Sequence, residues 1–214
     1  MKIRVLLTED HHVMRDGLKS LLEQQTDIAV VGAADNGRMA VKLARELSPD
    51  VVIMDIAMPE LNGIEATRQI TTKSRDTKVL ILSMHADSHF VSGAVEAGAS
   101  GYLMKDCSFD ELLSAIRSVA QGKAYFSSDI AGNIISEYIG GNVNDPAERG
   151  RLSSREREVL QLLAEGKSSA QIAVILGLHE RTVDVHRHKI MKKLDRHNVA
   201  ELTKYAVREG LTSL

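Results

Sequence analysis

The sequence predicts two domains of different classes: a doubly wound α/β domain with a five-stranded parallel sheet, followed by an all-α domain of four helices. Strand and helix patterns alternate five times within residues 1–121, as in a parallel sheet covered by helices. The second half has no strand pattern. Residues 151–214 carry 12 Lys and Arg against 8 Asp and Glu, whereas the rest carries 15 against 21. This modest basic excess is weak evidence for a polyanionic partner of the second half.

Four apolar runs, rich in Val, Ile and Leu, each end directly before a polar side chain. The runs are 3–8 before Glu9 and Asp10, 51–54 before Asp55, 79–82 before Ser83, and 101–104 before Lys105. Such runs are typical of strands buried on both faces of a parallel sheet, whose ligands bind outside the carboxyl ends of the strands. Any one of these residues could simply cap a strand, but the ordered set predicts a site.

Three carboxylates, a hydroxyl and an ammonium at one edge favour phosphoryl chemistry. Clustered carboxylates repel one another unless a cation lies between them, and Mg²⁺ prefers oxygen ligands. A carboxylate can also accept a phosphoryl group, a reaction that needs charge neutralisation more than acid–base groups. Asp55 is the best candidate nucleophile because it ends a fully apolar run and precedes the turn-forming stretch 57–63. Lys105 would neutralise charge, and the Ser83 hydroxyl could bind a phosphoryl oxygen.

Helical patterns fill the intervals between the strands, at 12–25, 37–47, 63–72, 87–97 and 109–120. Turn-forming residues at 140–146 predict a flexible linker, and residues 127–139 could form an amphipathic helix before it. We therefore expect domains at 1–121 and 150–214, joined by a linker at 122–149.

The pattern of the second domain predicts a helix-turn-helix. Its expected helices are 153–165, 170–176, 180–194 and 198–209. Ser153 and Glu156 have the spacing of a capping box at the first helix, and Gly177 begins the short turn before the third. The second helix of such a motif can enter the major groove of DNA.

The long helix 180–194 has two distinct faces. At 3.6 residues per turn, Val183, Arg187, Ile190 and Leu194 share the side expected to face the core, with His186 at its edge. The opposite side and its flanks supply the candidate DNA contacts, which are Arg181, Thr182, Asp184, Val185, His186, His188, Lys189 and Lys192. Thr182 and Lys189 would meet phosphates, and Asp184 could accept a bond from a cytosine amino group. On angle alone, a solvated helix face explains this stripe equally well.

Residues 1 to about 121 resemble the receiver domain of two-component response regulators. The matching features are Glu9-Asp10, Asp55-x-x-Met58-Pro59-x-x-x-Gly63, Ser83, and Gly101-Tyr102-Leu103-Met104-Lys105. The resemblance implies a flavodoxin-like five-stranded sheet, Mg²⁺ held by Glu9, Asp10 and Asp55, and phosphorylation of Asp55 by a sensor histidine kinase. It also implies contacts of Ser83 and Lys105 with the phosphoryl group, and a switch role for Tyr102.

Residues from about 150 to 211 resemble the LuxR-type helix-turn-helix. The matching segments are 152–160, 165–168, 172–173, 182–186 and 190–194. The whole chain therefore resembles response regulators of the NarL/FixJ type. Asp184 departs from the Lys that members often carry, and His179 from a capping Ser. Metal binding by His179, His186, His188 and His197 is a weaker reading than caps, packing and phosphate contacts.

The resemblance implies a transcription regulator whose phosphorylation controls dimerisation and binding to a double-stranded DNA operator. It places the dimer contact on the last helix, where Val199, Leu202, Ala206 and Val207 include the exposed candidates. No enzymatic activity is expected beyond Mg²⁺-dependent self-phosphorylation and autodephosphorylation at Asp55. The single cysteine, Cys107, excludes an internal disulfide, and no apolar run approaches the roughly 20 residues that span a bilayer. We expect a cytoplasmic protein without membrane contact.

Two other classes fit less well, and one alternative stays open. A haloacid-dehalogenase-like phosphatase needs a second Asp two residues after its nucleophile, where this chain has Ala57. A LuxR-type sensor of a diffusible ligand needs an aromatic pocket, and aromatic residues make up only 3% of the chain. A receiver that acts as a phosphorylation-independent dimerisation module is compatible with the sequence.

Overall fold

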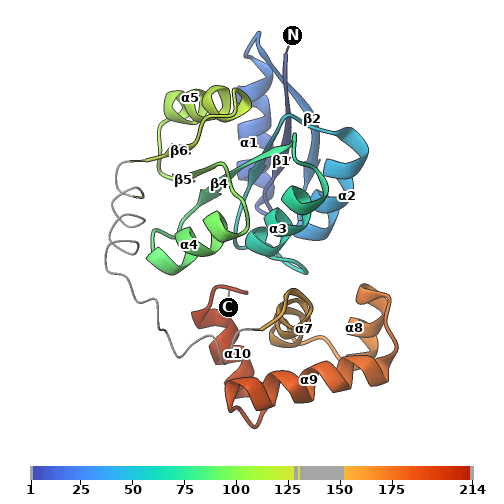
Figure 1. Ribbon diagram of the computed structural model, residues 1–214. Helices are drawn as coiled ribbons and strands as arrows, with labels where there is room; N and C mark the ends of the chain where they lie inside the picture. Colours follow the sequence, from blue (N-terminus) through green and yellow to red (C-terminus); the bar gives the residue numbers. More distant parts are fainter. Residues whose placement is uncertain (1, 128–129, 131–151, 213–214) are drawn as a thin grey trace. The chain divides into compact units, whose positions relative to one another are not determined.

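The computed structural model describes residues 2–127, 130 and 152–212 (Figure 1). The chain divides between residues 140 and 141 into two compact units, each of which has its own core. The predicted linker at 140–146 lies outside the described residues. Within the part of the chain that is described, no helix is both long and apolar enough to cross a bilayer.

The first unit is built on one parallel sheet with the strand order β2-β1-β3-β4-β5-β6. Its strands are β1 (Ile3–Thr8), β2 (Ile28–Ala34), β3 (Val51–Met54), β4 (Lys78–Ser83), β5 (Gly101–Met104) and β6 (Tyr125–Phe126). From β1 the chain first adds β2 on one side and then crosses to add β3 on the other. The strand order therefore reverses between β1 and β3, the position at which such sheets bind ligands.

The sixth strand corrects the five-stranded prediction. Tyr125 and Phe126, which we had assigned to the start of the linker, pair with Gly101 and Tyr102. The two backbones are close because Gly101 has no side chain: a Cβ there would lie 2.6 Å from the Tyr125 carbonyl oxygen. A two-residue strand has no periodicity, so its sequence carried no signal for it.

Helices cover both faces of the sheet, which confirms the doubly wound architecture (Figure 1). They are α1 (His12–Glu23), α2 (Gly37–Leu47), α3 (Gly63–Lys73), α4 (Ser88–Glu96) and α5 (Phe109–Ala120). Alternate residues of β3 enter different cores: Val51 and Ile53 pack with α1 and α5, whereas Val52 and Met54 pack with α2, α3 and α4. Of the helix expected over 127–139, only residues 127 and 130 are described, and Ile130 is fully buried in the second of these cores.

The second unit contains the four expected helices. They are α7 (Ser154–Ala164), α8 (Ser169–Leu176), α9 (Glu180–Leu194) and α10 (Val199–Arg208). The predicted capping box of Ser153 and Glu156 is present, and Ser168 forms a second one with Gln171. Gly177 ends α8 at a positive φ of 62°, a conformation that glycine adopts without strain. These local signals set the turn that separates α8 from α9.

Candidate functional site

Four side chains with metal-ligand chemistry meet at the strand-order reversal. Glu9, Asp10 and His11 follow β1, and Asp55 follows β3. Each of the four offers a ligand atom, and these atoms all lie within 4.8 Å of one another. The three carboxylates predicted from the sequence are therefore brought together. His11 was missed, although its place next to the acidic pair was a usable signal.

Lys105 links this cluster to β5. Its ammonium donates to Glu9 Oε2 at 2.8 Å and to Asp55 Oδ2 at 2.9 Å. The side chains of Lys105, Glu9 and Asp55 are 7%, 2% and 4% exposed, so these ion pairs are largely shielded from water. The Lys105 amide also donates to the carbonyl of Ser83 at 2.8 Å, which joins the ends of β4 and β5.

The protonation equilibria follow from burial and from the packing of charges. Burial raises the pKa of Asp55 above its usual value, although the hydrogen bond and charge of Lys105 act in the opposite direction. Burial acts to lower the pKa of Lys105, but bonds to Glu9 and Asp55 outweigh it and raise that pKa. The hydrogen bond to Glu9 and the charge of Asp10 raise the pKa of His11. Asp55, whose ionisation is made costly by burial, is thus held beside the Lys105 ammonium.

The cluster fits an oxygen-preferring cation. The Oδ1 atom of Asp10 is buried and forms no hydrogen bond with any described residue. His11 Nδ1 lies 2.8 Å from that oxygen and 2.9 Å from Glu9 Oε1, but it is hydrogen-bonded to Glu9. A buried carboxylate oxygen that accepts no hydrogen bond is costly, and a divalent cation with hard oxygen ligands would satisfy it. Glu9, Asp10 and Asp55 are the residues that would hold it.

The loop after Asp55 is folded tightly against it. The Gly63 amide donates to the Ile56 carbonyl at 2.9 Å, and a Cβ on Gly63 would lie 1.9 Å from the Asp55 carbonyl oxygen. Asn62 caps α3 by accepting from the Glu65 amide at 2.9 Å. The spacing from Asp55 to Gly63 therefore has a structural cause, because only glycine fits where the chain passes back over β3.

Ser83 and Tyr102 are connected through the segment after β4. Tyr102 is fully buried, and its hydroxyl donates to the His85 carbonyl at 2.5 Å. The His85 amide donates in turn to Ser83 Oγ at 3.1 Å. Burial raises the pKa of Tyr102 to about 12, so the hydroxyl is a permanent donor at neutral pH. Two hydrogen bonds therefore connect Ser83 to Tyr102 through the backbone of His85.

In the second unit, α9 has the two faces expected from its sequence. Val183 and Ile190 are fully buried in the core, and Arg187 and Leu194 are half-buried. Among the candidate DNA contacts, Thr182, Asp184 and His186 are half-buried, and the exposed ones are Arg181, Val185, His188, Lys189 and Lys192. A mostly basic stripe along a helix suits a polyanion.

Asp184 is held by the preceding helix. Its Oδ1 accepts a hydrogen bond from Ser169 Oγ of α8 at 2.8 Å. Its backbone carbonyl is 2.8 Å from His188 Nδ1. This bond between α8 and α9 competes with the base contact that the sequence suggested for Asp184, and angular position gave no sign of it. Within the described residues, no group of three or more potential metal ligands includes the histidines of this unit.

Several charged residues of the helix-turn-helix stabilise the domain. Lys193 donates to Glu156 Oε2 at 2.6 Å, and Arg155 donates both to Glu158 at 2.9 Å and to the Leu176 carbonyl at 2.7 Å. Burial acts to raise the pKa of Glu156, but bonds from Lys193 and the Ser153 amide outweigh it and lower that pKa. These contacts tie α7 to α8 and α9, which sets the position of α9.

Two family models match the chain, one for each unit. The response regulator receiver domain matches residues 5–117, and the luxR family of bacterial regulatory proteins matches residues 150–206. Response regulator UvrY of Escherichia coli K12 is 38% identical over 209 residues, covering 98% of this chain and 95% of UvrY. Transcriptional regulatory protein LiaR of Bacillus subtilis is 39% identical over 211 residues, covering 99% and 100%. Among solved structures, the response regulator ChrA of a heme-sensing two-component system is 35% identical, covers 98% of both chains and has a TM-score of 0.53.

Proposed function

Because this chain belongs to the response regulators that join a receiver domain to a LuxR-type DNA-binding domain, we propose that Asp55 is the phosphoacceptor controlling its DNA binding. The protein is a phosphorylation-controlled, DNA-binding transcription regulator. The observation that carries the assignment of Asp55 is its position: it is buried at the strand-order reversal, bonded to Lys105 and next to Glu9 and Asp10.

Each residue of the site has a defined part in the reaction. A carboxylate oxygen of Asp55 attacks the phosphorus of a phosphohistidine on a sensor histidine kinase, so that the O–P bond forms and the N–P bond breaks. Lys105 lies where it can neutralise the transferred group, and Ser83 can donate to a phosphoryl oxygen. Glu9, Asp10 and Asp55 would hold Mg²⁺, which would supply further charge neutralisation. Water then attacks the phosphorus of the acyl phosphate, which breaks the O–P bond to Asp55, releases inorganic phosphate and restores the free carboxylate.

The contacts of Ser83 supply a route for the signal. A phosphoryl group on Asp55 adds negative charge and acceptor oxygens, which draw the Ser83 hydroxyl toward them. The His85 amide would then lose its acceptor, and the Tyr102 hydroxyl, which is bonded to the His85 carbonyl, would follow. We infer that this shift changes the surface formed by α4 and β5 and thereby biases the association of the protein.

The output partner is double-stranded DNA. The exposed side chains of α9 would enter the major groove, with Arg181 and Val185 nearest to base edges and Lys189 on phosphate. The family resemblance places on α10 the contact of a homodimer that reads two half-sites. Leu202 and Ala206 are fully buried in the domain's own core and cannot supply it, which leaves the half-exposed Val199 and Val207 of the predicted set. The cytoplasmic location expected from the sequence stays a prediction.

The first test measures phosphoryl incorporation by intact mass. The full chain is incubated with a small-molecule phosphodonor and Mg²⁺, and Asp55→Ala is compared with Asp76→Ala, which removes an exposed carboxylate with no hydrogen bond to other described residues. We expect one phosphoryl group on the wild type and on Asp76→Ala, and none on Asp55→Ala. Incorporation that persists in Asp55→Ala would place the acceptor elsewhere.

The second test separates the phosphorylation switch from a constitutive dimerisation module. Operator affinity and association state are measured before and after phosphorylation. A switch predicts that both change in the wild type and that neither changes in Asp55→Ala. Equal affinity in all four states would favour the module.

A further inference from the structure

His188 lies at the centre of the side of α9 that carries the candidate DNA contacts. With 3.6 residues per turn, four other members of that set lie within about 60° of it around the helix: Arg181, Asp184, Val185 and Lys192. The fully buried Ile190 lies on the opposite side, and His188 itself is exposed. A side chain in this position faces whatever α9 binds.

The one hydrogen bond of the His188 ring fixes which of its nitrogens carries the proton. Nδ1 lies 2.8 Å from the backbone carbonyl oxygen of Asp184, one turn earlier in the helix. A carbonyl oxygen can only accept, so Nδ1 is the donor of this bond. In a neutral imidazole the other nitrogen then has no proton and is an acceptor. Nε2 forms no hydrogen bond or ion pair with any described residue, so its lone pair is free to accept from a ligand.

The Asp184 carboxylate gives the same part of α9 further acceptor atoms. It lies one turn before His188, and the Ser169 hydroxyl of α8 holds it there by donating to Oδ1 at 2.8 Å. An ionised carboxylate can only accept hydrogen bonds. Within the described part of the chain, no cation forms an ion pair with it. The carboxylate and Nε2 of the ring therefore both attract donors and repel other acceptors.

The major groove of DNA has few donors to offer. They are the amino groups at N4 of cytosine and N6 of adenine, whereas the polar atoms of guanine and thymine in this groove, N7 and O6 or O4, are all acceptors. A protein acceptor at a base edge can therefore bond to cytosine or adenine but finds no donor on guanine or thymine. Lysine and arginine show the reverse preference, because they have donors only and favour guanine.

We propose that Nε2 of His188 accepts a hydrogen bond from a base amino group, so that the operator half-site has cytosine or adenine at the position facing His188. The inference rests on the proposed binding of α9 in the major groove and adds the class of base. The Asp184 carbonyl is the positioning group, because it holds the ring and keeps the proton on Nδ1. The Asp184 carboxylate disfavours guanine at the same position by repelling its acceptors.

The test is a selection of bound sequences from random double-stranded DNA. The full chain is used with a small-molecule phosphodonor and Mg²⁺ at pH 8, where an ordinary histidine is neutral. His188→Lys is compared with His197→Lys, the same substitution at a side chain that is 82% exposed and lies beyond the end of α9. The wild type and the control should select cytosine or adenine over guanine about fivefold at one position, the ratio that one net hydrogen bond gives. His188→Lys should select guanine at that position.

A thermodynamic cycle on the selected base tests the bond itself. The amino group is removed by replacing the cytosine with pyrimidin-2-one or the adenine with purine, and affinities are measured for the wild type and for His188→Ala. Removal should weaken the wild type about fivefold more than His188→Ala. The accompanying loss of a base-pairing bond affects both proteins equally and cancels in the cycle.

The possible results separate this inference from the DNA-binding function. If His188→Lys and the wild type select the same bases throughout, or if the wild type selects guanine or thymine where they differ, His188 does not contact a base amino group. Equal losses of both proteins on removal of the amino group would lead to the same conclusion. Each of these results leaves DNA binding by α9 intact. A selection that gives no base preference with any of the proteins would overturn the proposed function and the inference together.

Discussion

Replacing Lys105 by methionine tests how far the receiver's stability depends on neutralising its own phosphoacceptor cluster. The Lys105 ammonium, 7% exposed as a side chain, donates at 2.8 Å to Glu9 and at 2.9 Å to Asp55. Methionine keeps most of the aliphatic stem, so the change removes chiefly the charge and its two bonds. A bond to a charged group contributes about 1.5–3 kcal/mol, and leaving a buried charge without its partner costs about 3–5 kcal/mol. Because the carboxylates can take up protons instead, we expect a loss of about 3 kcal/mol.

Native-state hydrogen exchange in EDTA measures this loss within the receiver alone. The amides of β3 and β5 should exchange roughly a hundredfold faster in Lys105→Met, since each 1.4 kcal/mol is tenfold. Lys123→Met is the matched control: Lys123 is exposed, so its substitution should change stability by less than about 0.5 kcal/mol. Mg²⁺ should slow exchange more in Lys105→Met than in the wild type, because the cation then replaces the missing ammonium.

A loss below about 1 kcal/mol would refute the reasoning. It would mean that Glu9 and Asp55 do not depend on Lys105 for charge compensation. An equal effect of Mg²⁺ on both proteins would refute it independently, because the metal would then not be filling the role of the missing charge.

The remaining predictions concern the phosphoacceptor, its loop and the second domain. Burial raises the folded-state pKa of Asp55 above the unfolded value, so the contribution of Asp55 to stability falls as the pH rises from the unfolded to the folded pKa. Asp55→Asn should therefore be more stable than the wild type at pH 7 in EDTA, as measured by urea denaturation. Gly63→Ala should lower the free energy of unfolding by about 3 kcal/mol and abolish phosphoryl incorporation, because its Cβ would lie 1.9 Å from a backbone oxygen. The control Gly17→Ala, which has open space around its Cβ in α1, should be neutral or stabilising. Lys193→Met should destabilise the second domain by about 1 kcal/mol at pH 7, a modest value because Lys193 is 38% exposed. The folded-state pKa of Glu156 is lowered, so the stabilisation by the Glu156 carboxylate is present above pH 4.5 and is lost as the pH falls through the folded-state pKa. Lys193→Met should therefore lose less stability than the wild type on acidification.

The candidate site was predictable because its residues stand at strand ends. Asp55, Ser83 and Lys105 each follow an apolar run, and the topology of a parallel sheet brings such ends to one edge. Strand β2, which ends in no candidate site residue, was harder to locate from the sequence. β2 is an edge strand with mostly half-buried residues, so it lacks the continuous apolar run of β3 or β4. Its existence followed from the alternation of elements, but its position did not.

The features that the sequence did not reveal are contacts between elements. β6 depends on Gly101 in a neighbouring strand, 24 residues earlier in the sequence than its partner Tyr125. Asp184 lies on the expected face of α9, but α8 supplies Ser169 to bind it. Leu202 and Ala206 lie on the amphipathic helix α10, and only the packing of α7 against it shows that they are buried. In each case the deciding partner lies on another element.

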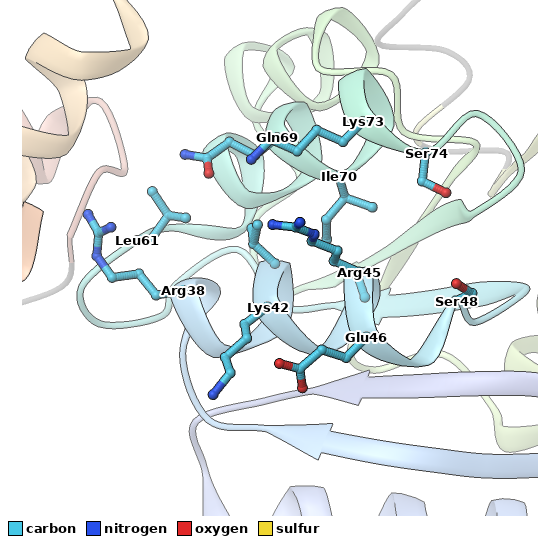
Figure 2. A pocket seen from close by; sticks show the side chains of 12 residues that line it. Arg38, Lys42, Arg45, Glu46, Ser48, Leu61, Gln69, Ile70, Lys73 and Ser74 are labelled. Carbon is cyan, nitrogen blue, oxygen red and sulfur yellow. The ribbon is translucent and has the colours of Figure 1, made fainter.

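The sequence by itself determined the features that depend on near neighbours: the strands and helices that carry the motifs, the cap of Ser153, and the order of the phosphoacceptor residues. The tertiary structure decided which distant groups meet. Lys105 reaches Asp55 across 50 positions of sequence, and residues of α2 and α3, which share no motif, line one pocket (Figure 2). The physical reason is that hydrogen bonding and periodicity act over a few residues, whereas burial, ion pairing and cavities depend on which surfaces the packed elements turn toward one another.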